Sequence, residues 1–161
     1  SYFKKSIPKI YDFEFLDRVV FLGEIANDKL LRFLYNNAIC LINPTLDSFG
    51  FPLVEAMSCG CPVIFANSYG SGSVVDKAGL PVNLIGSEFN FKKNNLIGAL
   101  DRNKVNTNRV SDQIFRHLDD LHKFQNLRSE FSEKSILQAK KFNWHSCAQQ
   151  HYGLFEELSD A

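Results

Sequence analysis

Residues 43–64 read NPTLDSFGFPLVEAMSCGCPVI, and this stretch decides the fold. It follows a short apolar run, residues 38–42, which is rich in β-formers and is closed by a proline, a pattern that predicts a buried strand. Pro52 suits the first position of a helix, because the N–H that proline lacks would have no partner there. Gly60 is a stop signal for that helix, and residues 63–65 predict the next strand.

The predicted order is strand, loop, helix and strand within about 28 residues, which is the length of a parallel βαβ unit. The loop after the first strand therefore lies at the carboxyl edge of a parallel sheet, where open α/β sheets bind ligands. A helix N-terminus at that edge presents unpaired amides and about half a positive charge, which suits a phosphate group. We expect an α/β fold, a Rossmann-like parallel sheet flanked by helices, with a helical C-terminal region.

Two carboxylates flank the predicted helix start. Asp47 lies in the loop, and Glu55 lies one turn into the helix. Carboxylates accept hydrogen bonds from sugar or ribose hydroxyls, and Gly50 lets the backbone approach a ligand closely. Two simpler interpretations stay open: Glu55 complements the helix dipole, or Asp47 is a solvated loop residue. The pair predicts a ligand that carries both hydroxyl and phosphate groups.

Residues 47–64 resemble the acidic signature of retaining glycosyltransferases of the family 4, group 1 type, in which two glutamates are separated by seven residues. Residues 18–23 resemble the strand and glycine that precede a helix of that family, here residues 27–36. Residues 74–79 resemble a later segment, and residues 142–144 the aromatic lead into the last helix. The resemblance implies the C-terminal, donor-binding domain of a two-domain GT-B fold glycosyltransferase.

The resemblance also implies roles for individual residues. Glu55 would hold the ribose hydroxyls of a nucleoside-diphosphate sugar, and Asp47 would address the transferred hexose, so these two form the expected catalytic pair. Gly23 and the main chain of Glu24 and Ile25 would line the base pocket. The nucleotide sugar is a substrate, and no metal or resident cofactor is expected. The other donor-binding positions surround the helix start: Ser48, Phe49, Gly50, Phe51, Pro52 and Leu53.

The chain departs from the family pattern at two positions. Asp47 stands where the family usually has glutamate and is one methylene shorter, and Ser73 stands where glutamate is frequent. We assign Ser73 no role. An alternative function stays open: a non-catalytic nucleotide-sugar-binding module of the same fold, in which Asp47 marks relaxed selection. A flavodoxin-like signalling domain is disfavoured, because its phosphoacceptor aspartate would end a strand.

The distribution of cations is uneven. No Lys or Arg lies between Arg32 and Lys77, although the proposed site holds two carboxylates and a diphosphate. A helix N-terminus supplies only about half a charge, so strong cations must come from elsewhere. The family uses an Arg and a Lys upstream of the segment that resembles residues 18–23. We therefore expect residues 1–161 to be one incomplete donor-binding domain, without its N-terminal acceptor domain and inactive alone.

Composition limits the other function classes. With 161 residues, 45% of them hydrophobic and 22% charged, the chain has enough material for one core. Its net charge of zero argues against nucleic-acid binding. No run approaches the roughly 18 apolar residues of a membrane span, so we expect a cytoplasmic protein. The basic excess of residues 91–141 favours a solvated helical face, and peripheral association with the inner face of a membrane stays open as the alternative.

Further elements follow from the remaining sequence. Residues 80–85 predict a strand, residues 94–101 a helix, and residues 110–124 and 127–142 two helical segments. Residues 68–73, SYGSGS, predict a flexible loop at the carboxyl edge of the sheet.

The last predicted helix begins after Asn143 as its cap. In the GT-B fold this helix crosses back onto the N-terminal domain, so its apolar stripe is expected to be partly bare in this chain. The stripe consists of Trp144, Cys147, Ala148, His151, Phe155 and Leu158. The pair Cys59 and Cys61 has no second Cys or His pair at zinc spacing, which argues against a metal site.

Overall fold

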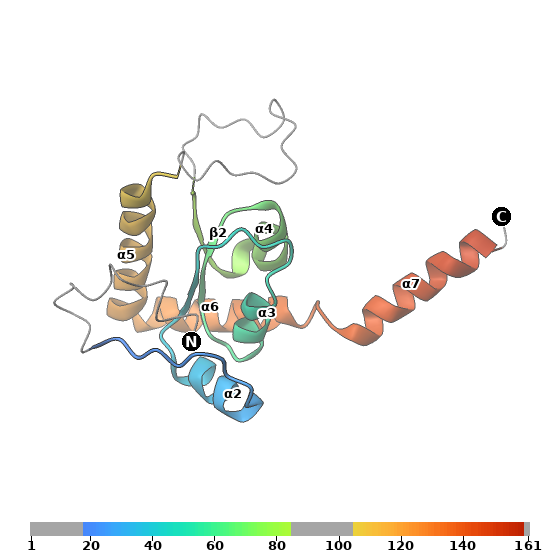
Figure 1. Ribbon diagram of the computed structural model, residues 1–161, viewed down its shortest axis with the longest axis horizontal. Coiled ribbons are helices and arrows are strands. Elements are labelled where there is room, and N and C mark those ends of the chain that lie inside the picture. The colour runs from blue at the N-terminus through green and yellow to red at the C-terminus, as the bar shows by residue number, and fades with distance from the viewer. Residues whose placement is uncertain (1–17, 85–104, 160–161) are drawn as a thin grey trace. The chain divides into compact units, whose positions relative to one another are not determined.

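The computed structural model describes residues 18–84 and 105–159 (Figure 1). The chain divides into two compact units, residues 1–31 and residues 32–161. The second unit contains the sheet and residues 43–64. The helix expected at residues 94–101 lies outside the described residues.

Three parallel strands form the sheet of the described residues, in the order β1-β2-β3. They are β1 Leu41–Asn43, β2 Val63–Ala66 and β3 Leu80–Val82. The parallel sheet confirms the predicted fold class. β1 begins later than predicted because Ala38 N–H still bonds to the Leu34 carbonyl, one turn back in the preceding helix.

The central strand β2 is covered on both faces, and all four of its residues are buried. Val63 and Phe65 point to a core formed with α3, Phe51–Ser58, and α4, Tyr69–Val75. Side chains alternate along a strand, so Ile64 points to the opposite face. The helices α3 and α4 therefore pack on the face of Val63 and Phe65, and Ile64 belongs to a second core on the opposite face.

The opposite face is covered by α5, Thr107–Lys123, whose Leu121 packs with Ile64. Two side chains of α5 also reach the edge strand. The Gln113 amide bonds to both the N–H and the carbonyl of Asn83, at 3.1 and 3.2 Å, and His117 Nε2 lies 3.1 Å from the Pro81 carbonyl oxygen. The Asn83 main chain is therefore engaged by α5, and β3 ends at Val82 instead of continuing to residue 85 as predicted.

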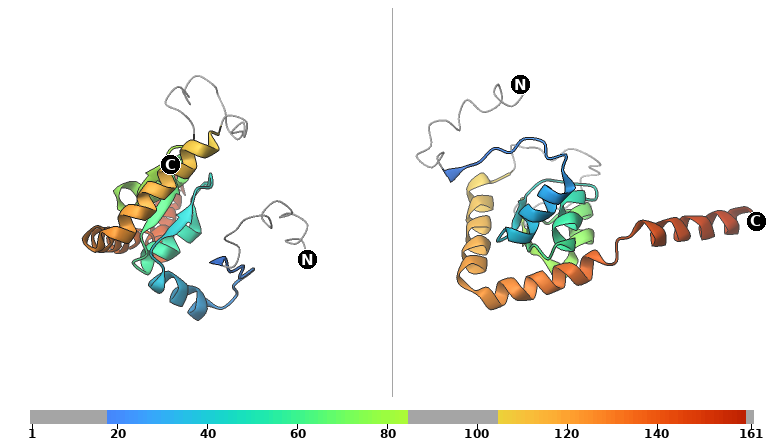
Figure 2. Two further views of the ribbon diagram at one scale, coloured as in Figure 1. Left: turned by 90° about the vertical axis from the view of Figure 1, so that its left-hand side faces the viewer. Right: turned by 90° about the horizontal axis from the view of Figure 1, so that it is seen from below.

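The helix α6, Gln125–Ala139, contacts α3, α5 and the short 3-10 helix Asp76–Ala78 that precedes β3, and it runs on from the end of α5 in the right-hand view of Figure 2. Two buried polar side chains tie it there. Ser135 Oγ donates to the Ala78 carbonyl at 3.3 Å, and Gln138 Nε2 donates to the Val74 carbonyl at 2.8 Å. Both predicted C-terminal helical segments are confirmed. Among the described residues, α6 does not contact the carboxyl ends of the strands, where the loop between β1 and α3 begins.

Residues 68–73 are not the flexible loop that the sequence predicted, because α4 begins at Tyr69. Ser71 Oγ donates to the Ala66 carbonyl at 2.6 Å, and Gly72 N–H bonds to the Ser68 carbonyl at 2.6 Å. The first bond ties α4 to the end of β2, and the second closes the first turn of α4 on its cap residue. Serine and glycine are poor helix formers, so the tertiary contacts outweigh their propensity.

The described part of the first unit differs from the sequence prediction. Residues 19–27 form no strand or helix in the described part of the chain, although residues 18–23 resemble a strand. Strand assignment needs a paired ladder, and the described ladders join β1, β2 and β3 alone. The helix α2, Asp28–Asn37, begins as predicted: Asn27 Oδ1 accepts bonds from the N–H groups of Lys29 and Leu30, at 2.9 and 3.2 Å.

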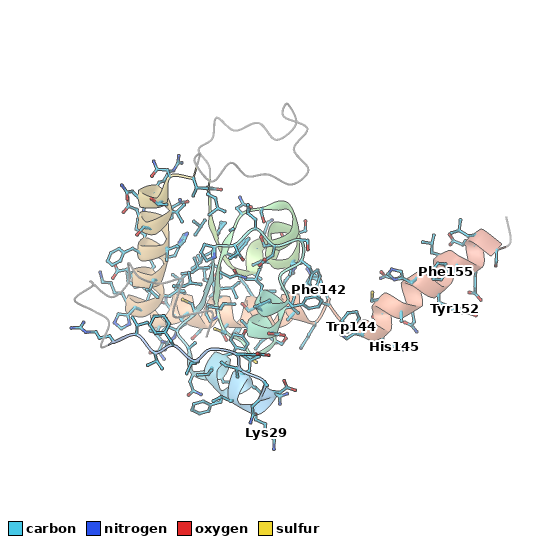
Figure 3. All side chains as sticks on the ribbon, viewed as in Figure 1. Lys29, Phe142, Trp144, His145, Tyr152 and Phe155 are labelled. Carbon is cyan, nitrogen blue, oxygen red and sulfur yellow. The ribbon has the colours of Figure 1, made fainter. Side chains whose placement is uncertain are left out.

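The last helix α7, Trp144–Ser159, also begins as predicted, with Asn143 Oδ1 accepting from Ser146 N–H at 2.8 Å. None of its residues is buried. Figure 3 shows Tyr152 and Phe155 projecting outward from it, and the prediction of a partly bare stripe is confirmed by the exposure of Phe155 and Leu158. Within the described residues, no helix has the length and apolar character needed to cross a membrane.

Candidate functional site

The loop between β1 and α3, residues 44–50, which we call the acidic loop, fixes the Asp47 carboxylate. Asn43 Nδ2 donates to Asp47 Oδ2 at 3.1 Å. The Thr45 hydroxyl lies 2.8 Å from the same oxygen and close to Asn43 Oδ1, so its single proton serves either acceptor. Both contacts use Oδ2, and no described residue bonds to Oδ1. That oxygen of the half-buried side chain can accept a ligand hydroxyl.

Gly50 turns the chain from the acidic loop into α3. Its φ of 85° and ψ of 64° are left-handed, and a Cβ there would lie 2.8 Å from Leu53 Cδ1, so glycine meets both demands. Gly50 is the helix cap, and α3 begins at Phe51, one residue before the predicted start at Pro52. Leu53 N–H already bonds to the Gly50 carbonyl at 2.9 Å. Since Pro52 has no N–H, an anion would meet the amides of Gly50 and Phe51.

Gly70, in the first turn of α4, lies directly against the acidic loop. A Cβ at this position would fall 2.0 Å from the Ser48 carbonyl oxygen and 2.2 Å from the Asp47 carbonyl oxygen. Real side chains do not approach backbone oxygens this closely, so only glycine allows this contact. The position of the acidic loop thus depends on α4, a segment that the sequence predicted to be a flexible loop.

Glu55 lies one turn after the start of α3, and its side chain is exposed. Tyr35, from α2, donates a long hydrogen bond from its hydroxyl to Glu55 Oε2, at 3.5 Å. Burial, and after it the neighbouring Glu55 charge, raise the pKa of Tyr35 to about 12. The phenol therefore stays protonated at neutral pH and remains a donor to the carboxylate.

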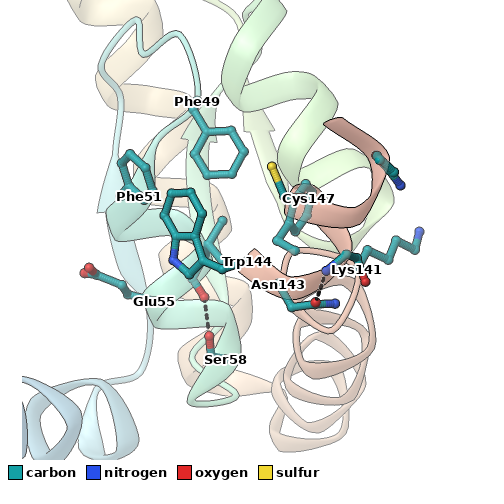
Figure 4. Close-up of a pocket in the computed structure, with 12 residues that line it drawn as sticks. Phe49, Phe51, Glu55, Ser58, Lys141, Asn143, Trp144 and Cys147 are labelled. Carbon is teal, nitrogen blue, oxygen red and sulfur yellow. Dashed lines mark hydrogen bonds between the residues drawn. The ribbon is translucent and has the colours of Figure 1, made fainter. Parts of the chain in front are cut away.

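A cavity of about 600 Å³ opens between α3 and the junction of α6 with α7 (Figure 4). This volume is in the range of small-molecule sites. Phe49, Phe51 and Glu55 line it from one side, and Trp144 and Gln150 line it from α7. The lining is mostly apolar, with a few polar groups.

Four aromatic rings join the acidic loop to the start of α7. The Phe49 ring centroid lies 5.0 Å from Phe51 and 5.6 Å from Phe142, the latter contact edge-on at 85°. Trp144 stacks on Phe51 at 6.4 Å with 25° between the ring planes. These separations are typical of stabilising aromatic pairs. Sequence reasoning identified residues 142–144 by resemblance but did not place them beside Phe49 and Phe51.

The structure brings some of the predicted site residues together and separates others. Phe49, Phe51 and Glu55 share the cavity, whereas Asp47 lies in the acidic loop and does not line it. Ser48 is exposed beside Asp47, while Leu53 is fully buried in the core, so that only its main chain can face a ligand. The residues predicted to line the base pocket belong to the first unit, and their role stays a prediction: Gly23, Glu24 and Ile25.

One cation approaches the cavity from an unexpected part of the chain. Lys141 lines the cavity at the end of α6, but its Nζ donates to Gln138 Oε1 at 2.6 Å. Figure 4 shows the Lys141 side chain extending away from Glu55. The ammonium group is therefore not directed at the carboxylate side of the cavity.

Two of the four cysteines are chemically quiet. Burial raises the pKa of Cys40 to about 11 and that of Cys61 to about 12. The thiolate is the reactive form of cysteine, and it is scarce at neutral pH when the pKa is this high. Both side chains pack in the core clusters.

Comparison with known proteins assigns the family. The sequence profile of the family described as glycosyl transferases group 1 matches residues 1–93, more than half of the 161 residues. The chain belongs to this family. The match contains the acidic loop and all of α3, and the predicted membership of the group 1 glycosyltransferases is confirmed.

Three relatives are similar over different lengths. O-antigen chain mannosyltransferase B of Escherichia coli is 30% identical over 139 residues, 86% of this chain and 30% of that protein. An uncharacterized glycosyltransferase of Methanocaldococcus jannaschii is 25% identical over 145 residues, 90% of this chain and 35% of that protein. O-antigen chain mannosyltransferase RfbU of Salmonella typhimurium is 39% identical over 59 residues, 36% of this chain and 16% of that protein. The chain spans about a third of the length of the first two relatives.

Proposed function

We propose that this chain supplies the donor-binding half of a retaining glycosyltransferase that moves a hexose from a nucleoside-diphosphate sugar to an acceptor. The observation that carries the proposal is the arrangement of Asp47 and Glu55 on either side of the left-handed Gly50, where β1 gives way to α3. Family membership supports glycosyl transfer as the chemistry.

The two carboxylates differ in surroundings, which supports different roles. Asp47 is half-buried, and its Oδ2 is held by Asn43 and Thr45, so the other oxygen has a fixed direction for a sugar hydroxyl. Glu55 is exposed beside a cavity and is approached by one phenol. A pair of neighbouring ribose hydroxyls can donate to such a carboxylate. We assign the sugar to Asp47 and the ribose to Glu55.

The diphosphate would lie at the start of α3. The amides of Gly50 and Phe51 and the positive end of the helix dipole would stabilise the negative charge that grows on the diphosphate as it leaves. An eight-residue helix supplies only part of that charge. No Lys or Arg lies between Arg32 and Lys77. We therefore propose that strong cations from outside this segment complete the site.

The relatives suggest which hexose is transferred. Two of them carry the name O-antigen chain mannosyltransferase. We therefore propose mannose as the leading candidate for the transferred sugar and a growing polysaccharide as the acceptor class. From the resemblance to the two-domain GT-B fold, we also propose that a second domain would hold the acceptor and that the enzyme would work at the cytoplasmic face of a membrane.

Calorimetric titration with UDP, GDP and ADP tests the donor site, using the protein that carries this chain. We expect one of the three nucleotides to bind. Glu55→Ala should weaken its affinity about tenfold or more, because the ribose loses a charged hydrogen-bond partner. Glu133→Ala, which removes an exposed carboxylate from α6, is the matched control and should leave affinity unchanged. Equal affinity before and after Glu55→Ala would refute the ribose assignment.

A further inference from the structure

The Tyr35 side chain contacts the Glu55 carboxylate. Its hydroxyl lies 3.5 Å from Glu55 Oε2, and the two residues are 20 positions apart in sequence. The distance is long for an O–H···O hydrogen bond, so the contact is weak without a ligand. Hydrogen bonds in ligand-free sites are often long and shorten when the ligand binds.

The two partners differ in how firmly they are held. The Tyr35 ring is half-buried and packs against the core that α3 shares with β2. Glu55 is exposed and has several rotatable bonds, so ordering it costs conformational entropy. A fixed donor beside a mobile carboxylate reduces that cost before a ligand arrives.

The protonation state of Tyr35 suits this task. Burial and the neighbouring Glu55 charge both raise its pKa, to about 12. The hydroxyl thus keeps its proton across the physiological range and does not become a second anion beside the carboxylate.

We infer that Tyr35 is a positioning residue for Glu55: it holds Oε2 and thereby presents the rest of the carboxylate to the two neighbouring hydroxyls of a ribose. This inference rests on the proposed function, because it deepens the role given there to Glu55. Its consequence is specific. Tyr35 should contribute to the preference for ribose over a sugar that lacks the 2′- and 3′-hydroxyls, without touching the nucleotide itself.

The test compares ribonucleotides with their 2′,3′-dideoxy analogues. Tyr35→Phe is titrated with UDP, GDP and ADP. Its affinity for the nucleotide that binds should be about three- to tenfold weaker than that of the wild type, because one hydrogen bond is lost. The affinity of its dideoxy analogue should not change. Phenylalanine keeps the ring in the core, and thermal unfolding of the variant checks that the fold is intact. Tyr152→Phe, at an exposed tyrosine of α7, is the matched control and should change neither affinity.

A double-mutant cycle with Glu55→Ala distinguishes this inference from the proposed function. If Tyr35 acts through Glu55, adding Tyr35→Phe to Glu55→Ala causes no further loss. Equal losses for the ribonucleotide and the dideoxy analogue would show a merely structural role and overturn the inference. Tight binding by Tyr35→Phe, together with weak binding by Glu55→Ala, would overturn the inference alone. Failure of Glu55→Ala to weaken binding, or of all three nucleotides to bind, would overturn the proposed function and the inference with it.

Discussion

Gly70 and Ser48 lie so close that a Cβ on Gly70 would stand 2.0 Å from the Ser48 carbonyl oxygen. This approach joins the first turn of α4 to the acidic loop, next to Asp47. Both partners of the contact are backbone, so no side-chain rotation can relieve a clash there. The geometry of the carboxylate that we assign to the sugar therefore depends on a glycine in another element.

Gly70→Ala should displace either the acidic loop or α4. We expect a loss of about 1–3 kcal/mol in the free energy of unfolding, as for overpacked sites, and weaker donor binding. Urea unfolding and nucleotide-sugar titration measure the two effects. Gly153→Ala in α7 is the control, since no atom lies within 4 Å of its added Cβ, and it should raise stability by about 0.5–1 kcal/mol. Equal stability of wild type and Gly70→Ala would contradict the close contact.

Asp47→Glu restores the residue that the family usually has, but we expect it to lower donor hydrolysis. The bonds from Asn43 and Thr45 to Oδ2 are set for the shorter side chain. One added methylene would move the carboxylate away from these donors. Hydrolysis of the nucleotide sugar is the measurement, and Asp112→Glu, at an exposed position of α5, provides the control. A rate equal to or above that of the wild type would show that the two bonds do not matter.

Stability should fall as the pH rises from about 9 to 12. Burial raises the pKa of Cys61 from its ordinary value of 9.0 to about 12, so the folded state keeps a proton that the unfolded state has lost in this range. The stabilisation is complete below pH 9 and disappears as the pH passes through the folded value. Cys40 and Tyr35 act in the same direction. Urea midpoints across this range measure the slope, and Cys61→Ala should make it shallower. An unchanged slope in that variant would exclude Cys61 as a source.

Phe49→Ala should destabilise the fold more than Trp144→Ala. Phe49 is half-buried and contacts both Phe51 and Phe142, whereas Trp144 is 77% exposed and stacks on Phe51. We expect about 2–4 kcal/mol for Phe49→Ala and about 1 kcal/mol or less for Trp144→Ala. Chemical unfolding followed by circular dichroism measures both, since Trp144 is the single tryptophan and its loss removes the fluorescence signal. The reverse order would mean that α7 contributes more to stability than its exposure indicates.

Local sequence patterns were sufficient for the elements around the acidic loop. Three signals predicted the order of β1, α3 and β2: the apolar run that ends before Asn43, the proline at position 52 and the glycine at position 60. Each of these signals acts within a few residues, through a fixed φ, a missing N–H or a strand of apolar side chains. The same signals placed Asp47 and Glu55 on either side of a helix start.

Patterns failed where tertiary contacts outweighed local preference. Residues 68–73 predicted a loop because serine and glycine favour one, but Ser71 bonds to the Ala66 carbonyl and α4 forms. Any residue offers a backbone carbonyl, so the sequence carries no signal for such a bond. The segment at residues 18–23 resembles a strand in sequence. A strand also requires hydrogen bonds to a neighbouring strand, and the residues of the segment alone do not determine whether such a neighbour is present.

The sequence by itself determined the parallel α/β architecture, the family and the two carboxylates, because these follow from short-range spacing and residue chemistry. Only the tertiary structure decided what surrounds them: Gly70 against the acidic loop, Tyr35 beside Glu55, and Trp144 stacked on Phe51. These contacts join residues that are far apart in the chain. They arise when packed elements bring distant backbone and side-chain atoms together, and the position of a residue in the sequence does not reveal which distant atom it will meet.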